Sequence, residues 1–466
     1  MFRPYPDYKP TDLKWFEYLP KSWAILRTKQ VFRLVIEKAP ANNQMELLSV
    51  YTHIGVRPRK SLEQRGNKAS TTDGYWIVKK GDIISNKLLA WMGAIGASHY
   101  EGVTSPAYDI LRPIKSCNAD YYHFLFRTKK YLQQFKIRSR GIMDMRLRLY
   151  FDQFGQIPIP VPPRPEQDQI VAYLRAQDVH FSRFIKVKRE LIGLLTEQKL
   201  RIIDHAVTRG LDASVVLKPS GIDWLGEVPD HWDVSRLKYC VARIYSGGTP
   251  ETGVDGFWAD GGDGVPWLMI ADVTKADLVT NSKKRLTQEG LESKKLALLP
   301  AGTVLYTMYA SIGKTAVLGI DAAINQAILG LEPKKQKLQP TFLHHWLRIL
   351  ERHVRNLAST STQANLNAAK VKALPVFLPP LSEQSSICTW IETECRIFTD
   401  AIERAEEEIK LILEYRDRLI ADVVTGLVDV RGWVPSPDDA VADEDLAVLG
   451  DDEELDTDGE EDNGDN

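Results

Sequence analysis

The chain has 466 residues, which is too long for one ordinary hydrophobic core and favours two to four domains. Hydrophobic residues make up 44% of it, and no apolar run approaches the roughly 18 residues needed to cross a bilayer, so we expect a folded protein without a membrane segment. The formal net charge is −2, but residues 1–431 hold all 60 Lys and Arg and only 47 of the 62 Asp and Glu, so this part carries +13. Such a basic body can attract a polyanion, although it is equally consistent with simple solubility.

Residues 1–163 are expected to form a first globular module. They lack long helical periodicity, and short apolar runs such as 75–78 (Tyr-Trp-Ile-Val) lie between Gly, Pro and Asn residues. Runs of this length between turn-forming residues predict strands, and one helix is expected over residues 119–136. The pattern therefore predicts a mixed, β-rich α+β domain.

A long helix is predicted next, over residues 164–209 of a spacer segment that we place at 164–212. It follows the pair Pro162-Pro163, which favours an extended lead-in and a helix start. Apolar residues recur at steps of three and four, interrupted by Lys188 and Lys199: Phe181, Ile185, Ile192, Leu195, Ile202 and Ala206. This spacing is typical of a coiled-coil seam.

Residues 213–380 are predicted to form a second module that repeats the first. With a shift of 209 residues, Trp15, Pro20, Trp23, Arg27 and Lys29 align with Trp224, Pro229, Trp232, Arg236 and Lys238. The interiors match only weakly, as where Ala94-Ile95-Gly96 resembles Ser311-Ile312-Gly313. Strands are expected at 303–306 and 327–329 and a helix at 340–357. We expect two modules with a shared scaffold and different surfaces.

A second long helix is predicted over residues 381–426, within a segment placed at 381–430. A shift of 217 residues matches it to the first without a gap: Pro162-Pro163 with Pro379-Pro380, Glu166-Gln167 with Glu383-Gln384, and Val207-Thr208 with Val424-Thr425. Its apolar seam has one break, at Arg416. Two similar seams in one chain favour an antiparallel coiled coil that holds the modules at its opposite ends; the alternative is a helical hairpin within a single globule.

Residues 431–466 are expected to form a disordered acidic tail. From residue 432 onward the chain has fifteen Asp or Glu and no Lys or Arg. A segment with so few hydrophobic residues and so much charge of one sign cannot build a core.

No catalytic or metal-binding motif stands out in the sequence. Gly313-Lys314-Thr315 resembles the end of a phosphate-binding loop, but Met308 occupies the position of its first glycine. The chain contains no Asn-Pro-Pro-aromatic or Asp-Pro-Pro-Tyr tetrapeptide, the mark of amino-methyltransferases. The four cysteines form no C-x-x-C pair, and His344-His345 have no further ligand at metal-binding spacing. We therefore expect no active site, metal, cofactor or disulfide framework, and a cytoplasmic location.

Basic and polar residues instead indicate a nucleic-acid surface. Phosphates are bound by Lys, Arg and loop N–H groups, and base edges are read by Arg, Asn, Gln, Ser or Thr. The candidate DNA-binding residues of the first module are Arg57, Arg59, Lys60, Arg65, Lys68, Arg138, Arg140 and Arg146. Those of the second module are Lys283, Lys284, Ser311, Lys314, Thr315, Thr362, Gln363 and Asn365. Any one cluster is also consistent with an ordinary solvated face.

Several longer motifs lie in the second module: 224–232 (Trp-Leu-Gly-Glu-Val-Pro-x-x-Trp), 245–250 (Tyr-Ser-Gly-Gly-Thr-Pro), 311–314 (Ser-Ile-Gly-Lys), 324–327 (Ile-Asn-Gln-Ala), 361–366 (Ser-Thr-Gln-Ala-Asn-Leu) and 374–384. With them the chain resembles, over residues 11–430, the specificity (S) subunit of Type I restriction-modification systems. The first module departs from this pattern, with Thr104-Ser105-Pro106-Ala107 in place of 324–327 and residues 140–146 in place of 361–366. The two modules are therefore expected to read different sequences.

The resemblance implies a non-catalytic subunit of a DNA adenine methyltransferase and restriction endonuclease complex. Each module would be a target-recognition domain that reads one half of a bipartite site in double-stranded DNA, and the paired helices would set the spacer. Two modification (methyltransferase) subunits would dock on the helices and adjoining surfaces, and restriction (motor-nuclease) subunits would join for cleavage. These partners would bind S-adenosylmethionine and ATP, and no membrane is implied.

Two other classes of function stay open. A fused methyltransferase or nuclease would act on DNA by itself, which the missing tetrapeptide argues against. An interaction scaffold would bridge two partners through the helices without reading DNA sequence.

Overall fold

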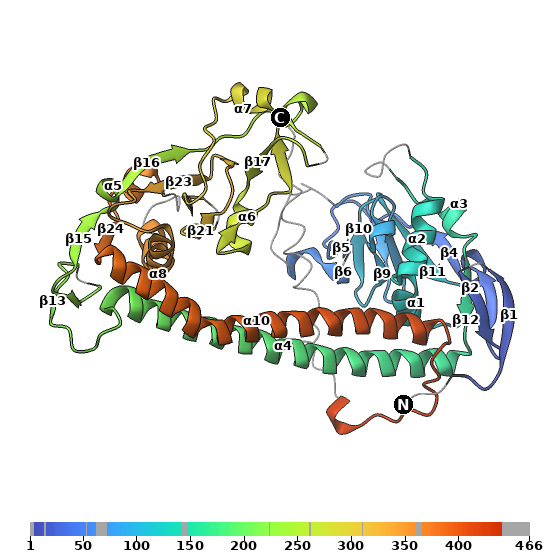
Figure 1. Cartoon of the computed structure of the whole chain (residues 1–466). Helices are drawn as coiled ribbons and strands as arrows, with labels where there is room; N and C mark the ends of the chain where they lie inside the picture. Colours follow the sequence, from blue (N-terminus) through green and yellow to red (C-terminus); the bar gives the residue numbers. More distant parts are fainter. Residues whose placement is uncertain are drawn as a thin grey trace. The chain divides into compact units, whose positions relative to one another are not determined.

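The computed structural model describes residues 4–439, except residues 14, 53, 62–71, 142–146, 223, 261, 310 and 360–365. The chain divides into two compact units, whose elements are labelled in Figure 1. Unit 1 comprises residues 1–190 and 405–466, and unit 2 comprises residues 191–404. Each unit therefore contains one module together with parts of both long helices.

Unit 1 is built on a four-stranded antiparallel sheet with the order β4-β11-β8-β9. Its strands are β4 (Phe32–Val35), β8 (Ile83–Asn86), β9 (Ile95–Ala97) and β11 (Tyr108–Pro113). Four antiparallel pairs accompany it: β1 (Tyr8–Leu13) with β2 (Phe16–Pro20), β3 (Ala24–Arg27) with β12 (Pro158–Val161), β5 (Leu48–Tyr51) with β6 (Gly55–Pro58), and β7 (Trp76–Val78) with β10 (Gly102–Thr104). Its short helices are α1 (Ala119–Phe126), α2 (Lys129–Arg138) and α3 (Phe151–Phe154).

The single helix expected over residues 119–136 is two helices, α1 and α2. The backbone is extended at Thr128, and the Thr128 hydroxyl donates to the carbonyl of Leu125 at 2.8 Å, so the first helix ends there. The break lets both helices turn aromatic side chains into one core. That core includes Phe32, Tyr122, Phe126, Phe135 and Phe154.

Unit 2 is built on a five-stranded sheet with the order β16-β23-β20-β21-β18, in which β18 and β21 are parallel and the other neighbours antiparallel. Its strands are β16 (Val241–Ser246), β18 (Leu278–Val279), β20 (Val304–Thr307), β21 (Thr315–Leu318) and β23 (Ile328–Pro333). The smaller sheets contain β13 (Leu217–Pro219) with β14 (Glu227–Pro229), β15 (Asp233–Arg236) with β24 (Pro375–Leu378), and β19 (Lys284–Leu286) with β17 (Val265–Leu268) and β22 (Ala323–Ile324). The short helices are α5 (Leu237–Cys240), α6 (Ile270–Lys275), α7 (Gln288–Ser293), α8 (Pro340–Ser359) and α9 (Ala368–Lys372).

The two predicted long helices are α4 (Arg164–Arg209) and α10 (Leu381–Val424), which pack side by side and antiparallel (Figure 1). In unit 1 their apolar seam contains an ion pair, in which Arg416 donates to Asp178 at 2.7 and 3.2 Å. Burial opposes the charge of Arg416, but the adjacent Asp178 carboxylate raises the pKa of the guanidinium above its ordinary value. Lys188 pairs with Glu408 in the same unit.

In unit 2 the remaining break in the seam is also partnered, because Lys199 donates to the Thr399 hydroxyl at 3.0 Å. Each basic residue that interrupts a predicted seam therefore contacts a polar residue of the other helix. The structure confirms the predicted class: α+β, with two β-rich modules and two long helices paired as an antiparallel coiled coil.

The matched residues of the two long helices make matched contacts. In unit 1 the Gln167 side chain donates to the carbonyl of Pro162 and accepts from the Asn118 amide, both at 2.8 Å. In unit 2 the Gln384 side chain donates to the carbonyl of Pro379 at 2.9 Å and accepts a hydrogen bond from the residue before α8 at 2.8 Å. The glutamine of each repeat thus ties the helix start to the preceding proline pair and to its module.

Residues 431–439 differ from the expected disordered tail. The Trp433 ring packs edge-on against Tyr173 of α4 at 5.6 Å, and Gln169 donates to the Trp433 carbonyl at 2.6 Å. The His180 Nε2 atom lies 2.8 Å from a carboxylate oxygen of Asp439. Residues 431–439 thus contact α4, which composition alone does not predict. Residues 440–466 lie outside the described part.

Within the described residues, no helix combines the length and the apolar character that a membrane span requires.

Candidate nucleic-acid interface

Two motifs of the second module form one structural element. In the turn after β16, the Gly248 amide donates to the carbonyl of Ile324 at 3.0 Å, and the Trp267 indole donates to the Gly248 carbonyl at 3.0 Å. A Cβ atom at Gly247 would lie 2.0 Å from the carbonyl oxygen of Asn325, so only glycine fits there. The Tyr-Ser-Gly-Gly-Thr-Pro and Ile-Asn-Gln-Ala motifs therefore meet through their backbones.

The residues after β20 bring two further motifs close to the turn after β16. We call the loops that follow β16 and β20 and precede β23 the edge of the module. The Thr307 hydroxyl accepts from the Lys314 amide at 2.9 Å. The Met308 amide donates to the Ala327 carbonyl at 2.8 Å, and the Leu366 amide donates to the Met308 carbonyl at 3.3 Å. Met308 after β20, Ala327 before β23 and Leu366 therefore lie together.

The three candidates around Gly313 have different surroundings. Ser311 is partly exposed on the loop after β20. The Lys314 ammonium lies 2.9 Å from a carboxylate oxygen of Glu351 in α8. Thr315 begins β21 and is 8% exposed. A lysine held by a carboxylate does not suit a phosphate-binding loop, and the burial of Thr315 gives no support for a DNA contact by its side chain.

The basic pair at the start of β19 is linked to the same edge through two tryptophans. The Lys284 ammonium lies over the Trp258 ring, 5.6 Å from its centre, and Lys283 is exposed. Trp258 packs edge-to-face on Trp267 at 5.2 Å, and Trp267 is bonded to Gly248. Sequence reasoning missed Trp258, although an aromatic residue that can stack under a lysine is a usable signal.

The first module has the same edge with different residues. At the end of β8 the Leu149 amide donates to the Lys87 carbonyl at 2.8 Å, as Leu366 does to Met308, and the Lys87 amide donates to the Ala107 carbonyl at 3.4 Å. Lys87 stands where the second module has Met308, an equivalence that becomes visible only through the strand pairing. Its ammonium lies 3.2 Å from a carboxylate oxygen of the buried Asp109, so, as for Lys314, the structure gives no support for a DNA contact by this lysine. In the sequence, the run 140–146 is thus followed by Leu149, which makes the contact that Leu366 makes at the end of the run 361–366.

One weak sequence match is corrected by this pairing. Lys80-Gly81-Asp82 precedes β8 as Ala301-Gly302-Thr303 precedes β20, so Ser85 is equivalent to Tyr306. Ser85 pairs with Ile95, and Tyr306 pairs with Thr315, so Ile95 is equivalent to Thr315. The match of Ala94-Ile95-Gly96 to Ser311-Ile312-Gly313 is therefore wrong, because the loops between the paired strands differ in length.

The candidates Arg57, Arg59 and Lys60 lie on one hairpin of unit 1. Arg57 belongs to β6, and the other two begin the 3-10 turn η2 (Arg59–Ser61). Arg57 is partly exposed and Lys60 is exposed, with its ammonium 3.4 Å from Glu46. The hairpin therefore presents three basic residues within four positions.

The candidates Arg138 and Arg140 make contacts within their own module. Arg138 lies over the Trp15 ring, 5.6 Å from its centre, and donates to Gln134 at 2.8 Å. Arg140 donates to Asp152 at 2.8 Å. Six other candidates lie outside the described residues: Arg65, Lys68, Arg146, Thr362, Gln363 and Asn365.

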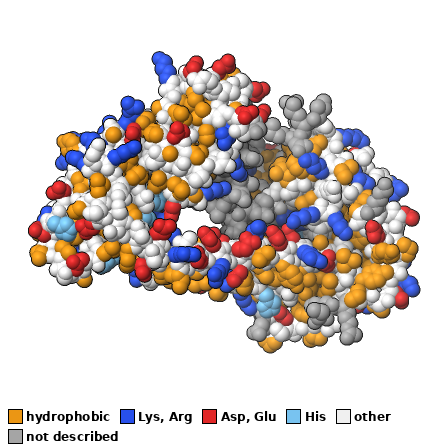
Figure 2. Space-filling view, viewed as in Figure 1, with side chains coloured by type: hydrophobic (Ala, Val, Ile, Leu, Met, Phe, Trp, Pro, Cys, Tyr) orange, Lys and Arg blue, Asp and Glu red, His pale blue; other side chains and the backbone are white. Residues whose placement is uncertain are grey.

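The charge of the face shown in Figure 2 is mixed, with Lys and Arg side chains interspersed with Asp and Glu side chains along the paired helices. The described residues contain no group of three or more His, Cys, Asp or Glu placed to bind a metal.

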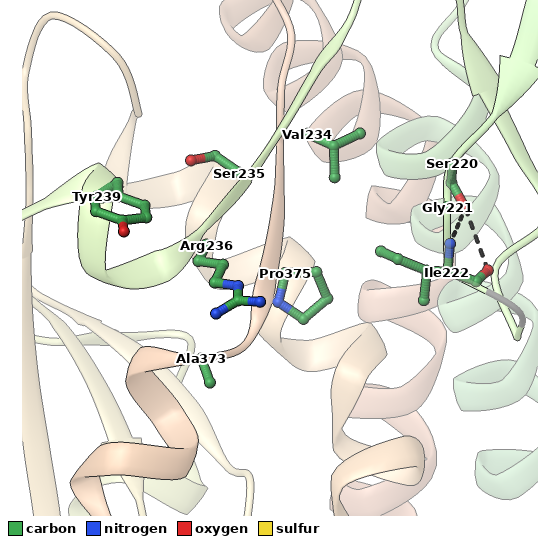
Figure 3. A pocket seen from close by; sticks show the side chains of 9 residues that line it. All are labelled: Ser220, Gly221, Ile222, Val234, Ser235, Arg236, Tyr239, Ala373 and Pro375. Atoms are coloured by element: carbon green, nitrogen blue, oxygen red, sulfur yellow. Dashed lines mark hydrogen bonds between the residues drawn. The ribbon is translucent and has the colours of Figure 1, made fainter.

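A groove of about 570 Å³ opens in unit 2 beside β15 and β24 (Figure 3). Among the described residues, its lining includes Arg236 and Tyr239 but no carboxylate, histidine or cysteine, so these residues offer no acid-base pair for catalysis. In unit 1 the matched Arg27 donates to Gln156 at 2.9 Å, whereas Ala373 stands at the matched position in unit 2. The groove therefore lies where the side-chain contact of the first repeat has no counterpart.

The model of the Type I restriction modification DNA specificity domain family matches residues 20–192 and 229–411, one match for each repeat. A solved structure that addresses complex assembly and conformational transition of the type I R-M system aligns with a TM-score of 0.54 and 16% identity, covering 87% of this chain and 98% of that chain. At this identity the likeness shows the fold alone.

Two curated relatives come from Methanocaldococcus jannaschii. The MjaIX specificity subunit of a Type I restriction enzyme is 24% identical over 192 residues, which is 40% of this chain and 42% of that protein. The MjaVIII specificity subunit is 23% identical over 431 residues, which is 89% of this chain and 94% of that protein.

Proposed function

Since the chain belongs to the family of Type I restriction-modification specificity subunits, we propose that it is non-catalytic and that each module reads one half of a bipartite site in double-stranded DNA. The five-part division predicted from the sequence belongs to this proposal: recognition domains at 1–163 and 213–380, spacer helices at 164–212 and 381–430, and the acidic segment 431–466. Two modification subunits and the restriction subunits supply methylation and cleavage and bind S-adenosylmethionine and ATP. The complex acts in the cytoplasm.

One observation carries the proposal: the two modules share a scaffold and differ at one equivalent edge. Leu149 and Leu366 make the same backbone contact at this edge, but the sequences that precede them differ, and Lys87 stands where the second module has Met308. A repeated scaffold with changed loops suits a protein that reads two different half-sites, because base readout depends on a few side chains held by a fixed backbone.

The paired helices suit the roles of spacer and docking site. The 46 residues of α4 give a rod of about 69 Å at 1.5 Å per residue. Large apolar side chains remain exposed on both helices, including Val187, Leu194, Ile397, Leu411 and Tyr415. Large apolar side chains left exposed on a helix pair are typical of a surface that a partner subunit covers.

A module exchange tests the division of labour. Residues 213–380 are replaced by the corresponding module of a relative, and methylated adenines are mapped in cells that carry the modification subunits. We expect one half of the methylated site to change and the other half and the spacer to stay the same. A chimera that methylates an unchanged site would overturn the assignment of modules to half-sites.

A paired insertion tests the spacer role separately. Four residues inserted beside Leu194 and four beside Leu411 lengthen the helix pair by roughly 6 Å, close to two base pairs. We expect both half-sites to be retained with a spacer that is longer by about two base pairs. A methylated site with the original spacer contradicts this role.

The second candidate is an interaction scaffold without sequence readout, favoured by the exposed apolar residues of the helices. Specific DNA binding exceeds non-specific binding by about a thousandfold or more. A preference far below this for any duplex, measured for the assembled complex at one stated salt concentration, would support the scaffold instead.

A further inference from the structure

Two arginines occupy equivalent positions in the two modules, which the sequence comparison did not match. Arg127 follows α1 directly, four residues after His123. Arg348 lies in α8, four residues after His344. The shift is 221 residues for both pairs, the same shift that relates Ser85 to Tyr306 in the strands.

In unit 1 Arg127 holds the turn of the β5–β6 hairpin. Its guanidinium donates to the Thr52 carbonyl at 2.5 Å, to the Gly93 carbonyl at 2.7 Å and to the Ile95 carbonyl at 3.3 Å. Thr52 belongs to the turn between β5 and β6, and the other two acceptors flank the start of β9. One side chain therefore ties the hairpin turn to the edge of the main sheet.

His123 supports the same turn by close packing. A Cβ atom at Gly55 would lie 2.8 Å from its imidazole ring, and a Cβ atom at Gly96 would also lie at 2.8 Å. Gly55 has a φ of +79°, which only glycine adopts without strain. The hairpin therefore packs directly on His123 of α1, the helix that Arg127 follows.

In unit 2 the equivalent arginine holds a different segment through a carboxylate. Arg348 Nη1 lies 2.9 and 3.0 Å from the two carboxylate oxygens of Asp277, and His344 Nε2 lies 3.6 Å from one of them. The Asp277 carbonyl accepts from the Val317 amide of β21 at 2.8 Å. Asp277 directly precedes β18, so this ion pair fixes the segment that enters the sheet.

In both modules the held segment leads within a few residues to candidate DNA-binding residues. The hairpin turn at Thr52 is followed by Arg57, and the segment at Asp277 is followed by Lys283 and Lys284. A guanidinium suits this task because its donors are fixed in one plane and can hold several acceptors at once. The acceptors differ between modules while the position of the arginine stays the same.

We infer that Arg127 and Arg348 are positioning residues for DNA recognition, each of which holds the segment that presents the basic residues of its own module. This inference rests on the proposed function, because it names the residues that place the DNA-contacting groups. Because each arginine holds a segment of its own module, replacing it should affect the reading of one half-site only.

The test compares Arg127→Met and Arg348→Met in the full chain, assembled with its modification subunits, on duplexes that contain the methylated site. Binding is measured by fluorescence anisotropy over a series of salt concentrations. We expect each variant to bind about tenfold more weakly, which is comparable to the loss of one contact. We also expect the slope of log affinity against log salt to fall by about one for each phosphate contact that is lost.

Duplexes with one scrambled half-site show which module each arginine serves. A duplex with a scrambled first half-site should abolish the difference between Arg127→Met and the wild type, and a scrambled second half-site should do so for Arg348→Met. Arg175→Met is the matched control, because it removes an ion pair with Asp120 at 2.7 Å in unit 1 without touching the hairpin turn. This control should leave affinity and slope unchanged.

Hydrogen exchange separates positioning from loss of folding. Arg127→Met should increase exchange in residues 48–58 and leave the amides of α4 protected. The milder variant Asp277→Asn provides the same comparison in unit 2. Faster exchange of the hairpin with unchanged affinity and unchanged slope would overturn the inference, whereas a wild-type complex that does not prefer its site would instead overturn the proposed function.

Discussion

The indole Nε1 atom of Trp23 donates to a carboxylate oxygen of Glu166 at 2.9 Å, and Trp232 donates to Glu383 in the same way at 3.1 Å. Trp23 and Trp232 match with a shift of 209 residues, whereas Glu166 and Glu383 match with a shift of 217. The structure joins the two matched stretches within each unit. A contact between the start of the module and the start of its helix therefore defines the scaffold of the repeat.

Replacing Glu166 by Ala should destabilise unit 1 by about 1–3 kcal/mol, because the substitution leaves the buried Trp23 indole without an acceptor. The Tyr5 hydroxyl, which donates to the same carboxylate at 2.6 Å, also loses its partner. Glu383→Ala should cost less in unit 2, because the Glu383 side chain is 27% exposed and water can replace it. Hydrogen exchange of the strands next to each tryptophan measures both effects, and equal costs would contradict the reasoning.

Replacing Asp178 by Ala should destabilise the helix pair by about 3 kcal/mol, because the substitution leaves the Arg416 charge in the seam without its partner. The double variant with Leu at both positions should recover most of this loss. Lys188→Ala is the matched control: Glu408 is half exposed, so its pair should contribute less than about 1 kcal/mol. Urea unfolding followed by exchange of the α4 amides checks the order of these three variants.

Unit 1 should lose stability as the pH falls from 7 to 5. Burial, with the nearby Arg127 charge, lowers the pKa of His123 to about 3. Below about pH 6.5 the imidazole is therefore protonated in the unfolded chain but stays neutral in the folded unit. The free energy of unfolding falls by up to about 1.4 kcal/mol per pH unit below that value. His123→Asn should flatten this dependence in chemical denaturation at pH 7, 6 and 5. An unchanged slope in the variant would assign the pH effect to another group.

Replacing Lys283 and Lys284 together by Ala should weaken DNA binding and lower the salt slope by about two, if each contacts one phosphate. The pair Lys238→Ala and Lys372→Ala removes the same charge from α5 and α9 of unit 2 and serves as the control. Anisotropy titrations at several salt concentrations compare the two double variants. Equal slopes in both would show that only the overall charge matters.

The spacing of apolar residues along the chain predicted the long helices and several of the strands. The seams of α4 and α10 were visible because their apolar residues recur at helical spacing, and the strands expected at 303–306 and 327–329 overlap β20 and β23, each beginning one residue too early. The helix over 119–136 was predicted without its break, because the residues on both sides of Thr128 favour a helix and the turn depends on packing of the aromatic core.

The candidate site was predictable only in part, because its partners are distant in sequence. The pairing of Lys314 with Glu351 joins residues of a loop and of α8, and no spacing rule relates them. Trp258 and Lys87 belong to the two equivalent edges through strand pairing and ring packing. Arg127 and Arg348 match only with a shift of 221, which differs from the shifts of 209 and 217 that the repeat shows elsewhere.

A map of methylated adenines in the genome of the organism that encodes the chain, before and after deletion of its gene, shows whether the chain specifies the methylated sequence. We expect methylation at one asymmetric, bipartite site to disappear on deletion and to return when the gene is restored. Methylation that stays unchanged when the chain is absent, although the modification subunits are produced, would contradict this expectation.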